Sequence, residues 1–185
     1  MLYDDSHLLF MGGPTQLGII GDTIRTVKVW REYAEAGGIL PEHFCINPLD
    51  GIPSPKSSGD GTTLRGNKNV AIFLYALGEF DGPSREDQLR FWSTVKIPIR
   101  CLIDSGNKSI HALIDVQKLV KIDTLDQWNE QIKNRLFGQF LKPMGIDAAT
   151  SNPARLSRIP GHFRSETGKY QRILWLSPEG RYISR

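Results

Sequence analysis

Apolar and polar residues along the chain form a pattern of short strands and amphipathic helices. Residues 7–11 make a short apolar stretch that predicts a strand. A helix is expected over residues 22–36, with Asp22 as its N-cap and the glycine pair at 37–38 as its stop signal. Residues 47–66 are rich in Pro, Gly, Ser and Asp, a composition that is typical of a loop.

The second part of the chain carries longer apolar stretches. Residues 70–81, with the sequence VAIFLYALGEFD, predict a buried strand. A helix is expected over residues 84–95, because it begins with an N-cap serine and has two acids in its first turn. Strands over residues 99–103 and 108–116, joined by a turn at 104–107, predict a hairpin.

Two further elements are expected toward the C-terminus. A helix over residues 124–141 is predicted by apolar side chains spaced four apart, which are Trp128, Ile132, Leu136 and Phe140. A final hairpin is predicted to pair residues 170–176 with 181–183 around a turn at 177–180. Strands, helices and hairpins in this order predict an α+β fold with a mostly antiparallel sheet.

Length and composition favour one soluble domain. The chain has 185 residues, of which 39% are hydrophobic, and this is enough for a core. No apolar run approaches the roughly 20 residues of a membrane-spanning helix, and the N-terminus lacks the basic start of a signal peptide, so a cytoplasmic protein is expected. Cys45 and Cys101 lack the ligand spacing of a zinc site and are predicted to be small buried side chains.

The positive charge of the chain is concentrated near its C-terminus. The formal net charge is +3, and from residue 141 onward eight basic residues accompany three acids. The basic residues of this segment are Lys142, Arg155, Arg158, Arg164, Lys169, Arg172, Arg181 and Arg185. Clustered Arg and Lys favour a polyanionic partner such as a triphosphate or a nucleic acid, although a solvated basic surface has the same composition.

Glu79 and Asp81 are the first candidates for chemistry. They lie two apart in the motif GEFD, so in a strand their side chains would point to the same side. Two adjacent carboxylates repel each other unless a cation lies between them, and hard oxygen ligands suit Mg²⁺ or Mn²⁺. The alternative is that the strand simply ends in solvent after Gly78.

Ser109 and His111 repeat this spacing in the motif KSIHALI of the predicted hairpin. A hydroxyl and an imidazole on one face can donate hydrogen bonds to phosphate oxygens. The preceding loop, with Gly106 and Lys108, offers backbone amides and a charge, so the whole segment is a candidate anion-binding site. The alternative is a tight turn followed by a buried histidine with a structural role.

Asp147 is the candidate for a third carboxylate. With Glu79 and Asp81 it would complete a site for two metal ions, and a structural role as a helix N-cap is the alternative. Asp104 and Asp115 are rival third ligands. The arginines that follow Asp147 carry planar donor groups that bind phosphate in a bidentate manner, and they are Arg155, Arg158 and Arg164.

Taken in order, the motifs GEFD, SGNKSIHALI and IDAATSNPARLSRIPG resemble those of the archaeo-eukaryotic primase superfamily. The likeness is to the primase-polymerase domains of phage, plasmid and other mobile-element replication proteins. That family carries an acid-x-acid motif, a Ser-x-His motif and a later hydrophobic-Asp motif. The likeness spans residues 47–175 and the three motifs occur in the expected order.

The resemblance implies a fold, a site and a reaction. An RNA-recognition-motif-like (RRM-like) core over residues 67–185 would lie beside a smaller α/β lobe and loop formed by residues 1–66, within one catalytic domain. The acidic motifs would bind two Mg²⁺ or Mn²⁺ ions, Ser109 and His111 with Lys108 nearby would hold the incoming triphosphate, and Arg155 and Arg158 would contact phosphate or template.

The resemblance further implies template-dependent joining of NTPs or dNTPs to a primer on DNA. The first motif has Glu before Asp, which leaves open whether Glu79 or Asp81 bridges both metals. No zinc-binding motif is present, and some members of the family use one to initiate primers, so extension of a primer is favoured over de novo priming. Two other functions stay open: a metal-dependent nuclease, and a non-catalytic module that binds an origin or a single strand. A helicase domain in a longer chain is a further expected partner.

Overall fold

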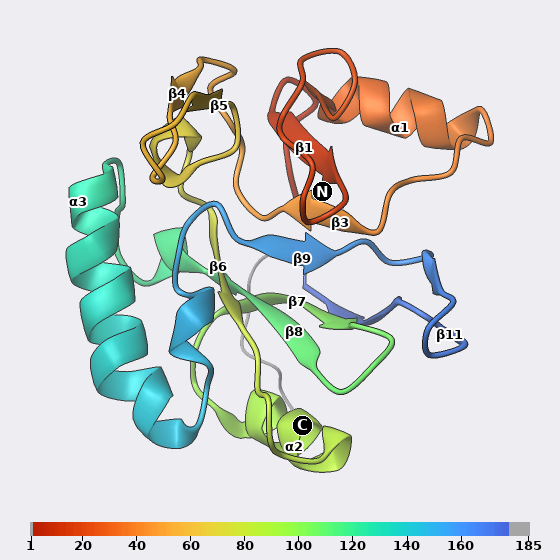
Figure 1. Ribbon diagram of the computed structural model, residues 1–185. Coiled ribbons are helices and arrows are strands. Elements are labelled where there is room, and N and C mark those ends of the chain that lie inside the picture. Colours follow the sequence, from red (N-terminus) through yellow and green to blue (C-terminus); the bar gives the residue numbers. More distant parts are fainter. Residues whose placement is uncertain (1, 178–185) are drawn as a thin grey trace.

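Two antiparallel sheets organise the structure, a computed structural model in which residues 2–177 are described (Figure 1). The first, here called the N-terminal sheet, has the strand order β2-β1-β3-β9. Its strands are β2 (Ile24–Thr26), β1 (Leu8–Gly12), β3 (His43–Cys45) and β9 (Leu156–Arg158). Strand β9 comes from far along the chain and pairs with β3, so a late segment completes a sheet that begins near the N-terminus.

The second sheet, here called the central sheet, has the strand order β12-β7-β8-β6. Its strands are β12 (Arg172–Leu176), β7 (Ile99–Asp104), β8 (Ile110–Asp115) and β6 (Tyr75–Gly78). Strands β7 and β8 form the predicted hairpin. Every strand pairing in the two sheets is antiparallel, which confirms the expected α+β class with mostly antiparallel strands.

The central sheet lies between two apolar layers, because its side chains alternate between its faces. One face, to which Ala112 belongs, packs in the cluster that contains side chains of α2 (Arg85–Thr94) and η3 (Trp128–Leu141). The other face, to which Leu113 belongs, packs in the cluster that contains Phe44 of the N-terminal sheet. This alternation decides which side chains at the strand ends face the N-terminal sheet.

Strand β6 is much shorter than the strand predicted over residues 70–81, and a buried asparagine explains the difference. Asn47 is fully buried, and its Oδ1 accepts the amides of Leu74 and Tyr75 at 2.7 and 2.8 Å. Its Nδ2 donates to the carbonyls of Tyr75 and Pro153, both at 2.9 Å. A side chain therefore satisfies the backbone just before β6, where a neighbouring strand would otherwise be needed.

The first helix begins five residues later than predicted. Residues 24–26 form β2, which pairs with β1, and α1 (Val27–Glu35) starts only after Thr26. The hydroxyl of Thr26 accepts the amide of Val29, so Thr26 and not Asp22 is the N-cap. The predicted end of the helix is confirmed, because Gly37 follows it with a φ of +86°, which suits glycine.

Helix α2 agrees with its prediction. Ser84 is the N-cap and accepts the amide of Asp87 at 3.1 Å. The helix buries Trp92 completely, and its Phe91 meets Phe80 edge to face with ring centroids 5.0 Å apart. Because Phe80 is anchored in this core, the residues on either side of it are directed to the opposite face of the sheet.

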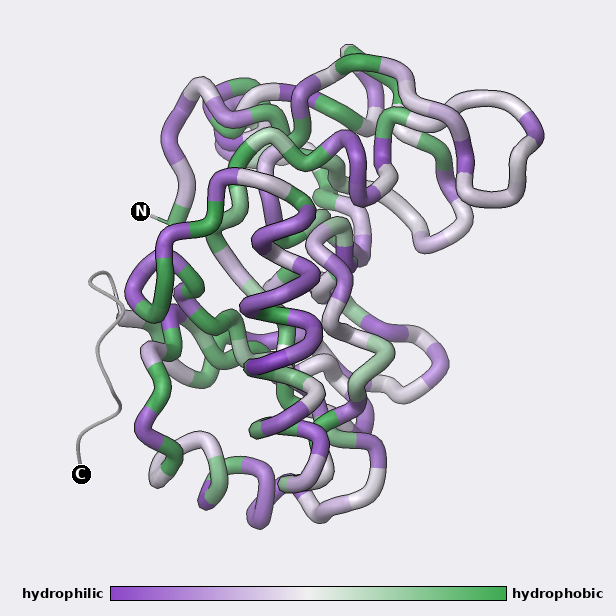
Figure 2. The backbone as a smooth tube through the Cα atoms, turned by 90° about the vertical axis from the view of Figure 1, so that its left-hand side faces the viewer, coloured by the Kyte–Doolittle hydropathy of each residue, from purple (hydrophilic) through white to green (hydrophobic). Residues whose placement is uncertain are grey.

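The third helix is wound more loosely than the sequence predicts. The segment α3 (Leu125–Gln127) continues directly as η3, a π-helix with i→i+5 hydrogen bonds. Wider turns place the buried side chains four, five and four residues apart, at Trp128, Ile132, Phe137 and Leu141. The prediction that Leu136 and Phe140 are buried is therefore wrong, since Phe140 is 41% exposed and Leu136 is half-buried. Figure 2 shows mostly hydrophilic residues on the outward side of this helix.

Several short elements complete the fold. The predicted loop over residues 47–66 contains a small strand pair, β4 (Ser54–Pro55) with β5 (Thr62–Thr63). The others are η1 (Asn67–Asn69), η2 (Val116–Lys118), η4 (Lys142–Met144), η5 (Ala148–Thr150), β10 (Phe163–Arg164) and β11 (Lys169–Tyr170). Residues 172–176 form β12 as part of the predicted last hairpin, but they pair with β7, and the expected partner at 181–183 lies outside the described residues.

Both cysteines are buried and free, as predicted, and burial raises the pKa of each thiol to about 11. Among residues 2–177, no helix combines the length and the apolar character that crossing a lipid bilayer would require.

Candidate functional site

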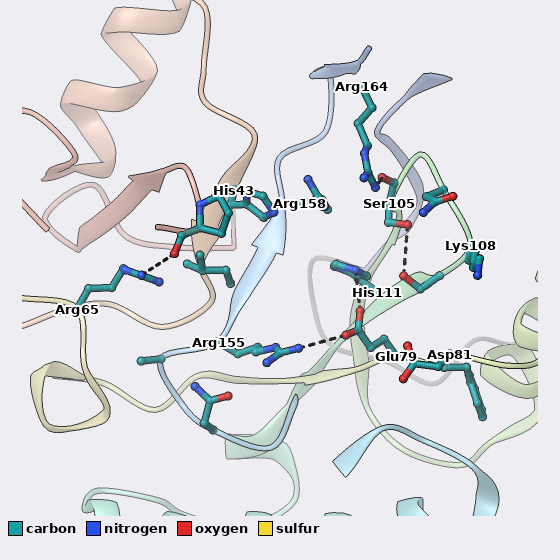
Figure 3. Close-up of a pocket in the computed structure, with 17 residues that line it drawn as sticks. His43, Arg65, Glu79, Asp81, Ser105, Lys108, His111, Arg155, Arg158 and Arg164 are labelled. Carbon is teal, nitrogen blue, oxygen red and sulfur yellow. Dashed lines mark hydrogen bonds and ion pairs between the residues drawn. The ribbon is translucent and has the colours of Figure 1, made fainter. Parts of the chain in front are cut away.

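A cavity of about 530 Å³ is lined by residues of both sheets (Figure 3). Five of its lining side chains are cationic and two are acidic. The cationic side chains are Arg65, Lys108, Arg155, Arg158 and Arg164, and the acidic ones are Glu79 and Asp81. Such an excess of positive charge around a concave site favours a polyanionic ligand.

The strand alternation explains why Glu79 and His111 meet in this cavity. His111 is in β8 next to Ile110, whose side chain is fully buried in the helix-facing layer, so His111 points to the opposite face. Glu79 follows β6 directly and precedes the anchored Phe80, which gives Glu79 the same orientation. The predicted common face of Ser109 and His111 is confirmed, since both line the cavity.

Glu79 is held by His111 and Arg155. Its Oε2 lies 2.9 Å from Nε2 of His111, and its Oε1 lies 3.4 Å from Nη2 of Arg155. Burial alone would raise the pKa of Glu79, but the hydrogen bonds and charges of His111 and Arg155 outweigh it, so the pKa lies below its usual value. Glu79 is therefore a carboxylate at neutral pH.

Ser157 fixes the other side of the His111 ring. The hydroxyl of Ser157, in β9, lies 3.0 Å from Nδ1 of His111 and is fully buried. Because Nε2 faces the carboxylate of Glu79, which only accepts, Nε2 carries a proton. In the neutral ring Nδ1 is then an acceptor, and Ser157 donates to it. This chain of contacts connects the N-terminal sheet to the central sheet.

Asp81 and Asp147 are placed differently from one another. Asp81 lines the cavity and is exposed, and within the described part of the chain its carboxylate has no hydrogen-bond or ion-pair partner. Asp147 does not line the cavity. Its backbone amide donates to the carbonyl of Glu79 at 2.9 Å, while its carboxylate caps η5 by accepting the amide of Ala149 at 2.8 Å.

Neither rival third ligand reaches the cavity. Asp104 forms two short hydrogen bonds with the guanidinium of Arg85, at 2.6 and 2.7 Å, and Asp115 accepts the amide of Lys118 and lines a different cavity. Both carboxylates are therefore engaged outside this cavity. Within residues 2–177, no three His, Cys, Asp or Glu side chains gather closely enough to hold a metal ion by themselves.

The loop before Ser109 presents side chains to the cavity more than backbone amides. The amide of Ser105 donates to the carbonyl of Ser109, and the amide of Gly106 donates to Oδ1 of Asp104. Both amides are used internally, so the expected cradle of amides is at least partly wrong. The hydroxyl of Ser109 bonds that of Ser105 at 3.3 Å, and Lys108 lines the cavity beside them.

A buried glutamine in α2 holds this loop in place. Gln88 donates to the carbonyl of Lys108 at 3.0 Å and accepts the amide of Ile110 at 2.8 Å. Its side chain is 1% exposed, so losing either bond would leave a buried polar group without a partner. Ser109 lies between Lys108 and Ile110, so its orientation depends on Gln88.

The opposite wall of the cavity is cationic. Arg158 donates to Glu42 at 3.0 Å, Arg164 donates to the carbonyl of Ser105 at 3.3 Å, and Arg65 donates to the carbonyl of Pro14 at 3.0 Å. The Nε atoms of Arg65 and Arg164 are buried without a partner among the described residues. Cationic side chains that surround a cavity favour an anionic ligand.

His43 belongs to this wall and stays neutral near pH 7. It lies directly opposite Arg158 in the pairing of β3 with β9 and is 7% exposed. Burial, followed by the charge of Arg158, lowers the pKa of His43 to about 4. The charges of His111 and Arg164 act in the same direction, and the carboxylate of Glu42 opposes them only in part.

Sequence reasoning missed several lining and supporting residues. His43, Arg65 and Ser105 line the cavity, and Ser157 and Gln88 support it from within. Ser105 and Ser157 lie within the segments SGNKSIHALI and IDAATSNPARLSRIPG that were already singled out, whereas His43, Arg65 and Gln88 lie in no recognisable motif. Their contributions depend on strand pairings between distant segments, which a local pattern does not reveal.

Comparison of the chain with models of protein families and with curated proteins finds no match. Among solved structures, the fold is similar to that of the AEP domain of the primase-polymerase (PrimPol) of cyanophage S-2L, with a TM-score of 0.52. The similarity covers 94% of this chain and 83% of that one, at a sequence identity of 17%. At this identity the likeness concerns the fold.

The lowered pKa of His43 predicts a dependence of stability on pH. Between about pH 6.5 and pH 4 the unfolded chain protonates this histidine while the folded protein does not, so the free energy of unfolding falls as the pH is lowered. His43→Gln removes this contribution. Urea unfolding at pH 7 and pH 5 should show a smaller loss of stability in His43→Gln than in wild type. Equal losses would contradict the assignment.

Proposed function

We propose that this chain is a template-dependent nucleotidyltransferase that joins NTPs or dNTPs to a primer on a DNA template. One observation carries the proposal: a single cavity combines two carboxylates with five cationic side chains. A triphosphate needs cationic side chains for its oxygens and a divalent cation for its charge, and this donor set offers sites for both. The fold similarity to a primase-polymerase domain supports the same proposal.

The donor chemistry fits Mg²⁺ or Mn²⁺, and two ions are proposed. Such ions are usually bound in phosphoryl-transfer sites by one or two carboxylates together with phosphate oxygens of the substrate, and Glu79 and Asp81 offer the carboxylates. When bound, the ions supply Lewis acidity, which lowers the pKa of the attacking hydroxyl and stabilises the leaving oxygens.

The chain's own donors would orient the triphosphate. Lys108, Ser109 and His111 would hold the β- and γ-phosphates, and Arg155 and Arg158 would add planar donor groups from the opposite side. Both ring nitrogens of His111 are engaged in this structure, by Glu79 and by Ser157, so His111 becomes available to phosphate only when Glu79 takes another partner. Release of Glu79 and capture of phosphate would therefore be coupled.

In the proposed reaction, the 3′-hydroxyl of a primer attacks the α-phosphorus in line and pyrophosphate leaves. The protein contributes positioning and a preorganised positive field, which are the main sources of rate in phosphoryl transfer. Arg65 and Arg164 belong to the same field, because they line the wall that faces the two carboxylates, and the neutral His43 lies beside them.

Asp147 is proposed as the third carboxylate. Its amide is bonded to the carbonyl of Glu79, so its backbone is directly beside the acidic motif. Its side chain now caps η5, and to act as a ligand the carboxylate would have to leave the amide of Ala149. A capping role alone is the competing explanation.

DNA is the proposed macromolecular partner. Template and primer would contact the basic residues that follow residue 141, chiefly through their phosphates, so binding should weaken as salt rises. An RRM-like core from residue 67 beside a smaller lobe formed by residues 1–66, and a helicase domain as a partner in a longer chain, belong to the same proposal.

Asp81→Ala should abolish primer extension without unfolding the protein, because Asp81 is exposed and faces the cavity with a free carboxylate. The measurement is extension of a labelled primer on a DNA template, with NTPs or dNTPs, in Mg²⁺ and in Mn²⁺. Asp60→Ala, which removes an exposed acid from the loop between β4 and β5, is the matched control and should keep full activity.

Wild-type rates in Asp81→Ala would contradict the role of Asp81. In the same assay, shortening of the labelled strand by the wild-type protein would indicate a nuclease. Binding of the strand without any change in its length would indicate a non-catalytic module.

Asp147→Asn separates a metal ligand from a cap. Asparagine can still accept the amide of Ala149, because it keeps an oxygen at the same position, but it lacks the negative charge. If Asp147 is the third ligand, extension should fall by at least about a hundredfold while thermal unfolding is unchanged. Full activity in Asp147→Asn would assign the residue to the cap alone.

His111→Ala should raise the KM for the triphosphate or lower kcat by about one to two orders of magnitude, since a charge-assisted contact is lost. Ser157→Ala should move the same parameter by a smaller factor, because the ring loses only its support. Nitrogen chemical shifts of the His111 ring report its tautomer and should change in Ser157→Ala. The matched control is Ser151→Ala, another buried serine; equal effects of the two serine variants would contradict a specific role of Ser157.

A further inference from the structure

Two aromatic rings stand exposed on the small hairpin formed by β10 and β11. Phe163 and Tyr170 lie directly opposite each other in the strand pairing and are 47% and 51% exposed. Their ring centroids are 5.0 Å apart, with a tilt of 57° between the planes. The pair, here called the aromatic hairpin, therefore presents two adjacent ring surfaces to solvent.

Hydrogen bonds attach the aromatic hairpin to the wall of the cavity. Its turn is closed by the amide of Gly168, which donates to the carbonyl of Arg164 at 2.9 Å. The hydroxyl of Thr167 donates to the carbonyl of Gly106 at 2.7 Å, and Arg164 donates to the carbonyl of Ser105. Since the loop at 105–109 lines the cavity, a strand that crosses the hairpin passes close to the cavity.

The charge around the rings is positive. From residue 161 to residue 177 the sequence has three cationic residues and one acid, and that acid, Glu166, is paired with Arg164 at 3.3 Å. Lys169 and Arg172 are exposed. Lys169 is in β11 next to Tyr170, and Arg172 begins β12 two residues after Tyr170. Exposed aromatic rings with flanking cations are the features that bind single-stranded nucleic acid.

The aromatic residues of the central sheet do not offer such a surface. Phe73 and Tyr75 are 4% and 3% exposed, and Trp175 is half-buried against the core. Base stacking on the face of that sheet is therefore blocked by its own packing. Within the described part of the basic C-terminal segment, up to residue 177, the aromatic hairpin combines exposed rings with exposed cationic side chains.

We propose that the aromatic hairpin is a stacking platform for the bases of a single-stranded nucleic acid, with Arg172 and Lys169 contacting its phosphates. The identity of that strand as the template rests on the proposed function, but the binding itself does not. Stacking recognises bases and the cations recognise phosphates, so the platform should distinguish a normal strand from one that has lost its bases.

The test uses two labelled probes of equal length, an oligothymidine and a strand of abasic sites, and measures binding by fluorescence anisotropy at several salt concentrations. Wild type should bind oligothymidine at least about tenfold more tightly than the abasic strand. The variant Phe163→Leu/Tyr170→Leu keeps apolar side chains but loses both rings. It should lose about tenfold or more on oligothymidine and nothing on the abasic strand.

Two controls keep the result specific. Phe140→Leu removes a phenylalanine with a similar exposure, 41%, from helix η3 and should bind both probes as wild type does. Phe163→Tyr/Tyr170→Phe retains both rings and should also bind as wild type does. Thermal unfolding of each variant checks the fold, and a loss of oligothymidine affinity in the ring-retaining variant would count against stacking.

Several results would overturn the platform. One is an equal affinity of wild type for the two probes. Another is an equal loss of affinity for both probes in Phe163→Leu/Tyr170→Leu. A third is no loss of affinity in that variant, which would favour a protein partner for the aromatic hairpin. The outcome is independent of catalysis. Base-dependent binding without primer extension would refute the proposed polymerase activity and support the stacking platform. Primer extension without base-dependent binding would support the polymerase activity and refute the stacking platform.

Discussion

The contacts from Ser157 through His111 to Glu79 join the two sheets, and the geometry of the cavity depends on them. Ser157 belongs to the N-terminal sheet, while His111 and Glu79 belong to the central sheet and its edge. In this series of contacts the side-chain polar atoms of Ser157, His111 and Glu79 all have partners, although the three residues are largely buried. Removing one of them would leave an unsatisfied polar group, which costs about 1–3 kcal/mol. The spacing of the sheets is thereby fixed where the cavity opens.

Asn47 supplies a second polar constraint at the boundary between the sheets. Its side chain bonds the backbone of Leu74 and Tyr75 at the start of β6, and also the carbonyl of Pro153 shortly before β9. Because β6 leads to Glu79 and the segment after Pro153 leads to Arg155 and Ser157, one buried amide aligns both approaches to the cavity. A mostly apolar interface would slide more freely than these directional bonds allow.

Local patterns predicted much of the fold, and distant contacts explain what they missed. The hairpin of β7 with β8 and the capped helix α2 depend on nearby residues, and both were predicted correctly. The buried face of the third helix was predicted incorrectly, because the α-helical period of 3.6 residues does not apply to the π-helix that buries Phe137. In the site, alternation placed Ser109 on the face of His111, whereas His43 reached the cavity only through pairing of β3 with β9.

The distribution of charge gives the cavity two ends of different character. Glu79 is paired with His111 and Arg155, whereas Asp81 is exposed and its carboxylate has no partner among residues 2–177, so the acidic end keeps one uncompensated carboxylate. Unpaired buried donors remain on the cationic wall, and close packing of like charges there is unfavourable until an anion enters. A ligand that carries both a divalent cation and several phosphate oxygens would relieve both ends together. Neither a lone cation nor a lone anion would do so.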